Sequence, residues 1–220
     1  MPRRRTVLTL TLVGLVPAFA AVNSLVAATR ARRQQLSAEW AARGARDAAE
    51  GRALSAADDY RIAQEYARDR SQYRLQLAEA LVDAGRFLEA RAQLLTLWSE
   101  TPGDGVANLE LGRLAAKDGD VPGAIRFYHG AIDGAWIADA ADARRSARLE
   151  LARFLIAQDA RAAAQAELIM LSGDPPRDQA SAAELRALRI AAGLDPAPAR
   201  RIPFDPRLRV LPLSPARARR

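Results

Sequence analysis

The side chains that could carry out chemistry are few in this sequence. The sequence has one histidine, His129, and no cysteine, so no serine or cysteine nucleophile can be paired with a second histidine. For the same reason a histidine-rich metal site is impossible and a cysteine one is excluded. Glycine-rich phosphate-binding loops are also absent from the sequence. Two acidic residues, Glu79 and Asp83, are the only candidates for an acid pair acting on cell-wall or polysaccharide substrates, and both equally suit a helix surface. We therefore expect no enzyme activity, no metal, no cofactor and no small-molecule substrate.

The composition and charge favour a helical body with basic ends. Half of the 220 residues are apolar, and alanine and leucine, which are strong helix formers, dominate. The net charge is +7, but residues 1–36 contribute +6 and residues 194–220 contribute +5, so the residues between them carry −4. A nucleic-acid-binding domain carries its positive charge on the folded body. We therefore expect an all-α protein that does not bind nucleic acid.

An uncharged segment follows a basic N-terminus within residues 1–33. The 24 residues Thr6–Thr29 are long enough to cross a bilayer as a helix, and arginines flank them on both sides. A cleaved signal peptide is the alternative, with the small residues Ala18 and Ala20 marking a cleavage site after Ala20. We predict a single pass through a bacterial inner membrane with the body in the periplasm. The opposite topology, with the body facing the cytoplasm, stays open because the flanking arginines are balanced.

A period of 34 residues organises the middle of the chain. Gly85 and Gly119 are 34 residues apart, as are Ala90 and Ala124. Three units follow this period in register, at residues 37–70, 71–104 and 105–138. In each of them the eighth residue is small, the fifteenth is glycine, the twentieth is alanine and the twenty-fourth is large. Small residues let two helices approach closely, and glycine ends a first helix because it adopts a left-handed backbone without strain.

A fourth unit and a final helix extend the pattern. Residues 145–178 place Ala152 eighth, Ala164 twentieth and Leu168 twenty-fourth. This unit starts six residues late, which indicates a longer connection or a longer helix around the sequence GAWIADAADA. Residues 179–193 match one more first helix, and a lone terminal helix covers the last exposed apolar face of a repeat array.

This pattern resembles the tetratricopeptide repeat, a helix–turn–helix unit of 34 residues. The resemblance covers residues 37–193, and its motif residues include the aromatic residues Tyr60 and Tyr128 and the alanines Ala63 and Ala131. It implies a right-handed α-solenoid of about four helical hairpins plus a capping helix, preceded here by the N-terminal transmembrane or signal helix. It also implies a scaffold that binds proteins without catalysing a reaction.

The resemblance places a partner-binding groove along the first helices of the units. The residues predicted to line it are Gln72, Leu75, Glu79, Asp83, Leu109, Arg113, Lys117, Leu149 and Arg153, with Val82 and Val106 at equivalent positions. Three of these residues are basic and could bind an acidic or carboxylate-bearing peptide, and solvated surface charges are the alternative interpretation.

The C-terminal residues 194–220 contain six prolines and seven arginines, which excludes a long helix. Their apolar residues are more numerous than a disordered linker usually carries. We expect some of them to lie extended against the groove or another subunit: Ile202, Phe204, Leu208, Val210 and Leu211.

Together these features predict a protein–protein interaction scaffold tethered at a bacterial inner membrane, in an envelope assembly or export system. Its partner would be a protein, and the membrane would be contacted through residues 6–29. Two alternatives are kept: a cytoplasm-facing adaptor, and a non-catalytic accessory subunit of a cell-wall or polysaccharide enzyme complex.

Overall fold

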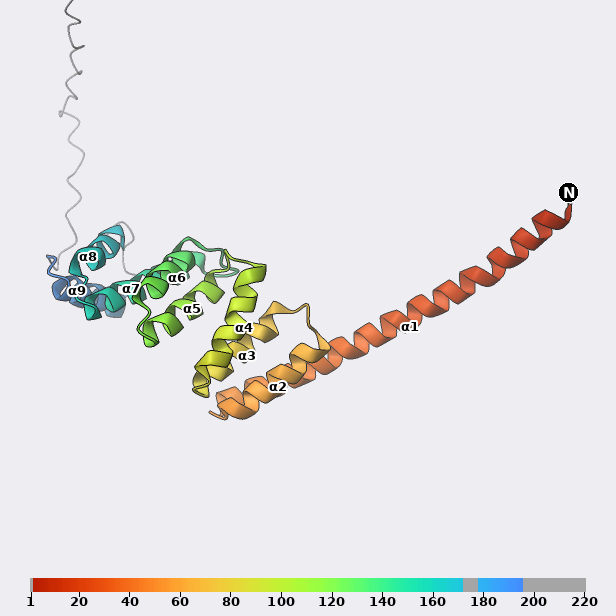
Figure 1. The fold of residues 1–220 in the computed structure, drawn as a ribbon, viewed down its shortest axis with the longest axis horizontal. Helices are drawn as coiled ribbons and strands as arrows, with labels where there is room; N and C mark the ends of the chain where they lie inside the picture. The colour runs from red at the N-terminus through yellow and green to blue at the C-terminus, as the bar shows by residue number, and fades with distance from the viewer. Residues whose placement is uncertain (1, 172–177, 196–220) are drawn as a thin grey trace, which may run out of the picture. The chain divides into compact units, whose positions relative to one another are not determined.

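The computed structural model describes residues 2–171 and 178–195, with side chains from Phe19 onward, and this part of the chain is helical (Figure 1). It contains nine helices and no strand: α1 (Pro2–Ala49), α2 (Ala53–Tyr66), α3 (Ser71–Asp83), α4 (Phe87–Glu100), α5 (Gly105–Lys117), α6 (Val121–Asp133), α7 (Ala140–Ala157), α8 (Arg161–Met170) and α9 (Gln179–Ala191). The prediction of an all-α fold is confirmed for the described residues.

The chain divides into two compact units, Met1–Leu151 and Ala152–Arg220, with the boundary inside α7. In the first unit, each helix from α1 to α6 packs against the next one along the chain. In the second unit, α8 contacts α9, and the Gln165 side-chain amide donates a hydrogen bond to the carbonyl oxygen of Ala192. Helices that pack on their neighbours in sequence bury apolar surface through short connections, which is typical of helical hairpins.

In the described part of the chain, five helices are each followed by a residue with a left-handed backbone conformation, two residues after the helix ends. These residues are Gly51, Gly85, Gly119, Asp159 and Gly193, with φ angles of 75°, 74°, 76°, 56° and 78°. At each turn the next residue's backbone N–H donates a hydrogen bond back into the last helical turn, as Arg86 does to the Leu81 carbonyl oxygen at 2.8 Å. The predicted role of the glycines is confirmed, and Asp159 occupies the equivalent fifteenth place in residues 145–178.

The helices of a pair approach closely where a small residue faces a large one. A Cβ atom on Gly44 would lie 3.0 Å from the Tyr60 ring, and one on Gly112 would lie 3.2 Å from the Tyr128 ring. In the pair α3–α4 the corresponding residues are Ala78 and Leu94, and both are buried. The smaller residue is therefore glycine where the facing residue is tyrosine, and alanine where it is leucine.

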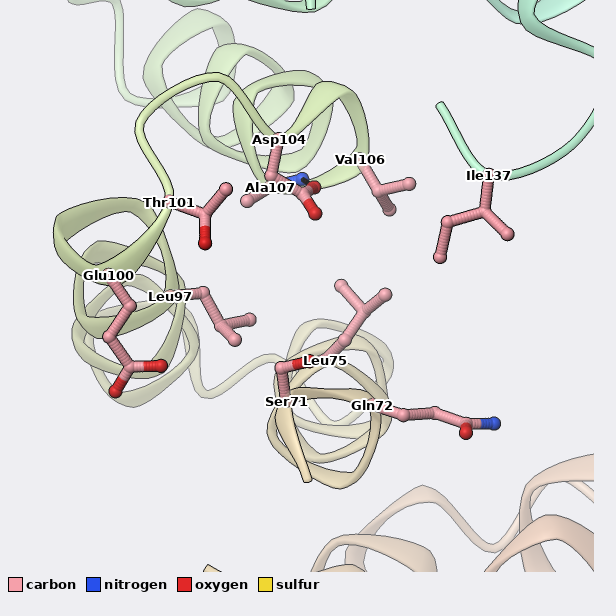
Figure 2. Close-up of a pocket in the computed structure, with 10 residues that line it drawn as sticks. All are labelled: Ser71, Gln72, Leu75, Leu97, Glu100, Thr101, Asp104, Val106, Ala107 and Ile137. Atoms are coloured by element: carbon pink, nitrogen blue, oxygen red, sulfur yellow. Dashed lines mark hydrogen bonds between the residues drawn. The ribbon is translucent and has the colours of Figure 1, made fainter. Parts of the chain in front are cut away.

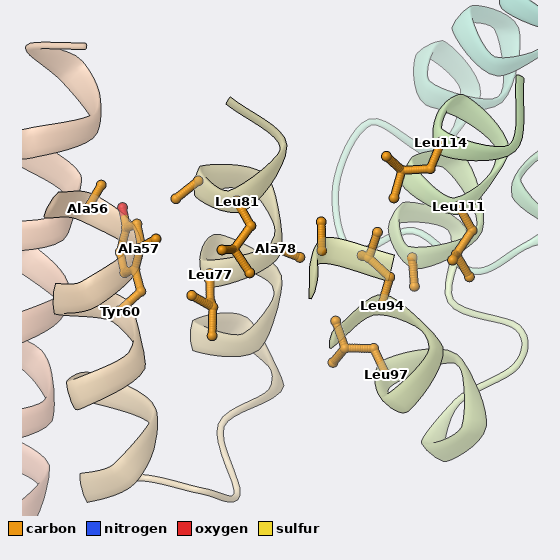
Figure 3. Packing of buried hydrophobic residues seen from close by; sticks show 13 residues of the cluster. Ala56, Ala57, Tyr60, Leu77, Ala78, Leu81, Leu94, Leu97, Leu111 and Leu114 are labelled. Carbon is orange, nitrogen blue, oxygen red and sulfur yellow. The ribbon is translucent and has the colours of Figure 1, made fainter. Parts of the chain in front are cut away.

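The core of the first unit runs through α2, α3, α4 and α5 (Figure 3). Its fully buried leucines are Leu77, Leu81, Leu94 and Leu111. Burying one such side chain stabilises the fold by about 1.5–3 kcal/mol, so this cluster is a main source of stability for the helix pairs. Between the leucines, the buried alanines Ala56, Ala57, Ala78 and Ala90 leave room for the helices to come together.

The six-residue shift before the fourth unit has a structural cause. The connection after α6 packs Trp136 onto Gly105, where an added Cβ atom would lie 2.4 Å from the indole ring. The Trp136 Nε1 atom also donates a hydrogen bond to the Ala131 carbonyl oxygen at 2.9 Å. Helix α7 then begins at Ala140, upstream of the predicted start at residue 145, so the extra residues form both a longer connection and a longer helix.

The predicted membrane-spanning segment is not found. Within residues 2–171 and 178–195, none of the helices combines the length and the apolar character that crossing a membrane requires. The predicted single-pass location in a bacterial inner membrane, with the body in the periplasm, is wrong on this finding.

Two other predictions fall on residues that are not described. The proposed cleavage motif includes Ala18, whose side chain is outside the described set. The tail residues predicted to contact the groove or another subunit, Ile202, Phe204, Leu208, Val210 and Leu211, also lie outside the described residues.

The turn glycines give a first testable prediction. We expect Gly85→Ala to lower the free energy of unfolding by about 1–2 kcal/mol, because an L side chain is strained at the left-handed φ of 74°. Gly103→Ala is the matched control, since Gly103 has no left-handed φ and no atom within 4 Å of an added Cβ. Urea unfolding followed by circular dichroism measures both variants, and equal losses in the two would contradict the assigned turn.

Candidate partner-binding groove

An open apolar cleft lies between the N-terminal halves of α3 and α5 (Figure 2). Its volume is about 190 Å³, and its lining includes residues of α4 and of the connection after α6. Three apolar side chains converge on it from separate segments: Leu75 from α3, Val106 from α5 and Ile137 from the connection. Ile137 is fully exposed to solvent, and an apolar cleft with a polar rim is typical of a surface that binds a partner.

The position of Ile137 follows from contacts at the start of α5. The Asp104 carboxylate accepts a hydrogen bond from the Ala107 N–H at 2.8 Å and caps the helix. The connection after α6 is bound to the same end of α5 by two backbone hydrogen bonds. The Gly105 N–H donates to the Ala135 carbonyl oxygen at 2.9 Å, and the Ala135 N–H donates to the Gly103 carbonyl oxygen at 2.8 Å. Together with the Trp136 contact described above, these bonds present Ile137 at the edge of the cleft.

A carboxylate-rich section of the same groove follows one helical turn further along both helices. It is lined by Glu79, Val82 and Asp83 of α3 and by Glu110 and Arg113 of α5. Leu75 and Glu79 are four residues apart, as are Val106 and Glu110, so each pair lies on one face of its helix. The apolar cleft and the carboxylate section therefore follow one another along α3 and α5, and we call the two together the α3–α5 groove.

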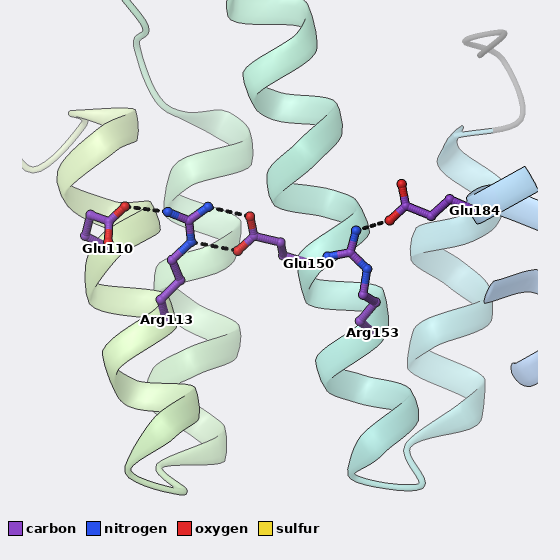
Figure 4. Close-up of polar contacts among 5 residues, drawn as sticks. All are labelled: Glu110, Arg113, Glu150, Arg153 and Glu184. Atoms are coloured by element: carbon purple, nitrogen blue, oxygen red, sulfur yellow. Dashed lines mark hydrogen bonds and ion pairs between the residues drawn. The ribbon is translucent and has the colours of Figure 1, made fainter. Parts of the chain in front are cut away.

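Arg113 is the one arginine that lines the carboxylate section. Its guanidinium group already binds two carboxylates of the same chain, those of Glu110 and Glu150 (Figure 4). Its Nε and Nη2 atoms donate to the two carboxylate oxygens of Glu150 at 2.8 and 2.5 Å, and its Nη1 atom donates to Glu110 at 2.5 Å. The hydrogen bond to Glu150 is the main reason why the pKa of Arg113 is raised. This bidentate pair joins α5 to α7 within the first unit.

The pKa values of the two glutamates in the groove are raised. Burial raises the pKa of the Glu79 carboxyl, and the negative charges of Glu110 and Asp83 raise it further, while Arg113 opposes them. Burial also raises the pKa of Glu110, against the attraction and hydrogen bond of Arg113. The ionised forms of Glu79 and Glu110 are thus disfavoured by the fold, which is common at binding sites and rarer on ordinary helix surfaces.

The other two basic residues predicted to bind an acidic peptide also have partners within the chain. The Lys117 ammonium lies 3.7 Å from the centre of the Phe87 ring, a cation–π contact between α5 and α4. In the second unit, Arg153 of α7 forms an ion pair with Glu184 of α9 (Figure 4). All three predicted cations therefore contact groups of the chain itself.

The remaining predicted groove residues differ in how much surface they offer. Gln72 and Leu75 line the apolar cleft, and Glu79 and Asp83 line the carboxylate section. Leu109 and Leu149 are only 8% and 6% exposed, so their side chains belong to the buried core.

Sequence reasoning missed Ile137 and the two glutamates that hold Arg113. Ile137 lies in the inserted connection, where a repeat of fixed length makes no prediction. Glu110 and Glu150 each stand sixth in their units, one place after the predicted groove residues Leu109 and Leu149. The spacing of three residues between Glu110 and Arg113 was visible in the sequence and is typical of an ion pair within one helix, whereas the pairing of Arg113 with Glu150 joins residues 37 apart.

Comparison with known proteins gives no family assignment. No protein-family model matches the chain, and no curated protein is significantly similar to it in sequence. Within residues 2–171 and 178–195, no group of three or more histidine, aspartate or glutamate side chains is placed to hold a metal ion.

The raised pKa of Glu79 predicts a pH-dependent effect on stability. Because the folded state favours protonated Glu79, its carboxylate destabilises the fold above the folded pKa, and this cost disappears as the pH falls through that pKa. We expect Glu79→Gln to be more stable than the parent at pH about 7, and the difference to vanish below the ordinary glutamate pKa of about 4.3. Urea unfolding at both pH values measures this.

The control is Glu65→Gln, which removes the same charge from an exposed residue at the end of α2. It should leave the free energy of unfolding within about 0.5 kcal/mol of the parent at both pH values. A loss of stability in Glu79→Gln at neutral pH would show that the carboxylate stabilises the fold, contrary to this interpretation.

Proposed function

We propose that this chain is a non-enzymatic binding protein built from tetratricopeptide-like helical hairpins, and that its α3–α5 groove holds an extended segment of a partner protein. The proposed architecture is the right-handed α-solenoid of about four hairpins and a capping helix that the sequence predicts. Such arrays act as scaffolds because each hairpin adds a further stretch of exposed helix surface to a shared groove.

Two regularities support the repeat interpretation. The left-handed residues Gly51, Gly85 and Gly119 recur at intervals of 34, as does the pair Asp159 and Gly193. Small residues face large ones at the eighth and twenty-fourth places of the units, and their sizes are matched. A period that determines both the turns and the helix contacts favours one structural unit used repeatedly.

The observation that carries the proposed function is the convergence of Leu75, Val106 and Ile137 on one open cleft. Exposing isoleucine fully to water gives up about 1.5–3 kcal/mol of burial that a core position would provide. The hydrogen bonds around Ala135 and the packing of Trp136 nevertheless hold the connection that carries it beside α5. An apolar side chain presented in this way on an ordered segment is well suited to an apolar side chain of a partner.

The proposal includes one of the alternatives drawn from the sequence. A non-catalytic accessory subunit of an enzyme complex would use the same groove, and its partner would then be the catalytic subunit.

The test is a selection of random peptides displayed on phage against the full-length chain. Peptides that bind are then measured against Val106→Ser/Ile137→Ser, which removes two apolar side chains from the cleft. The control is Leu88→Ser/Leu95→Ser, which removes two exposed apolar side chains from α4. We expect the cleft variant to lose at least about tenfold in affinity, since two apolar contacts are lost, and the control to keep it.

Circular dichroism is used to check that both variants remain folded. Equal affinity of the selected peptides for the cleft variant and the parent would refute the proposed binding site, even if the repeat fold is correct.

A further inference from the structure

Charged pairs between the first helices follow a repeated spacing. Arg113, ninth in residues 105–138, binds Glu150, which is sixth in residues 145–178. Arg153 is likewise ninth in residues 145–178, and it binds Glu184, which is sixth in residues 179–193. Both of these residues lie in the second compact unit, Ala152–Arg220. An arginine at the ninth place of one predicted unit thus pairs with a glutamate at the sixth place of the next (Figure 4).

This pattern is broken between α3 and α5. The ninth residue of the second predicted unit is Glu79, and the sixth residue of the third is Glu110, so two acids stand where an arginine and a glutamate pair at the two later interfaces. Both carboxylates line the same section of the α3–α5 groove, with Asp83 beside them. The negative charge of Glu110 raises the pKa of Glu79, which is direct electrostatic repulsion where the two later interfaces have attraction.

The nearby cations do not neutralise this section. Three carboxylates line this section, those of Glu79, Asp83 and Glu110, together with one guanidinium, that of Arg113. Arg113 is shared between Glu110 and a fourth carboxylate, Glu150 of α7. Lys117 stands one turn beyond Arg113 on α5, and its ammonium lies over the Phe87 ring. The groove therefore keeps an excess of negative charge directly beside an exposed apolar cleft.

We propose that the α3–α5 groove selects an extended partner segment that carries an apolar side chain and, two residues away, an arginine or lysine. The apolar side chain enters the cleft of Leu75, Val106 and Ile137, and the cation binds between Glu79 and Glu110. There it takes the place that Arg113 and Arg153 occupy at the two later interfaces. This inference rests on the proposed function and names the chemistry of its partner.

The spacing follows from the geometry of helices and extended chains. Leu75 and Glu79 are separated by four residues of helix, a rise of about 6 Å. In an extended peptide, side chains two residues apart lie on the same face and are about 6.6–6.8 Å apart. One face of such a peptide can therefore reach both sections of the groove at once. The partner chemistry is opposite in sign to the acidic peptide predicted from the sequence, because the three predicted cations are already paired.

Three labelled nine-residue peptides test the inference by fluorescence anisotropy with the full-length chain. The first has a leucine and, two residues later, an arginine in a glycine–serine background. The second has glutamate in place of the arginine, and the third has the arginine directly after the leucine. We expect the first peptide to bind at least about tenfold more tightly than the second, and more tightly than the third, with an affinity that falls as salt is added.

The variant Glu79→Gln/Asp83→Asn replaces two carboxylates of the groove with neutral amides. It should reduce the preference for the first peptide over the second to less than about threefold, because the groove then has fewer carboxylates to attract the cation. The matched control, Glu65→Gln/Asp69→Asn, removes two exposed acids elsewhere in the first unit and should keep the full preference.

The outcomes separate this inference from the proposed function. Binding in the cleft with no preference between the first and second peptides, or a preference for the glutamate peptide, overturns the inference alone. Binding of none of the peptides, together with a failed phage selection, overturns both. Two other occupants would also overturn it: a second copy of the chain, detected as self-association that Val106→Ser/Ile137→Ser abolishes, and the chain's own C-terminus, detected as tighter peptide binding after residues 196–220 are removed.

Discussion

The close approach of paired helices is the constraint on which the rest of this structure depends. A residue without a side chain, Gly44, lies against the Tyr60 ring, and Gly112 lies against the Tyr128 ring in the same way. Where the facing residue is the smaller Leu94, alanine at residue 78 suffices. Packing densities in protein interiors leave no room for a larger residue at these places, so the two positions of each pair must change together.

The groove is a consequence of this packing. Because α3 and α5 are each packed against their neighbours, they present fixed rows of side chains to each other, with Leu75 and Val106 at one end and Glu79 and Glu110 at the other. Buried residues hold the helices together, whereas the half-buried Leu75 and Val106 and the exposed Ile137 present their side chains to the groove. The like-charged pair of Glu79 and Glu110 is a place where the fold accepts an electrostatic cost, and such costs are commonly retained for function.

The sequence predicted the helices and their turns well because both depend on local chemistry and a fixed period. Helix α3 begins at Ser71 and α5 begins at Gly105, the first residues of the second and third predicted units. Prediction failed where the period does not apply. The inserted connection that places Ile137 has no repeat position, and the ion pairs of Arg113 and Arg153 depend on contacts between helices far apart in sequence. The membrane assignment came from an uncharged segment and its flanking arginines, and the described helices do not support it.

The most direct test of this account is a double-mutant cycle at the Gly44–Tyr60 contact. In the parent background, Gly44→Ala should lower the free energy of unfolding by about 1–3 kcal/mol, because the added methyl group meets the Tyr60 ring. In the Tyr60→Leu background, the same substitution should become neutral or stabilise the protein by up to about 1 kcal/mol, as alanine forms helix better than glycine. An effect of Gly44→Ala that is the same in both backgrounds would contradict the claim that the size of the facing residue determines which small residue the helix carries.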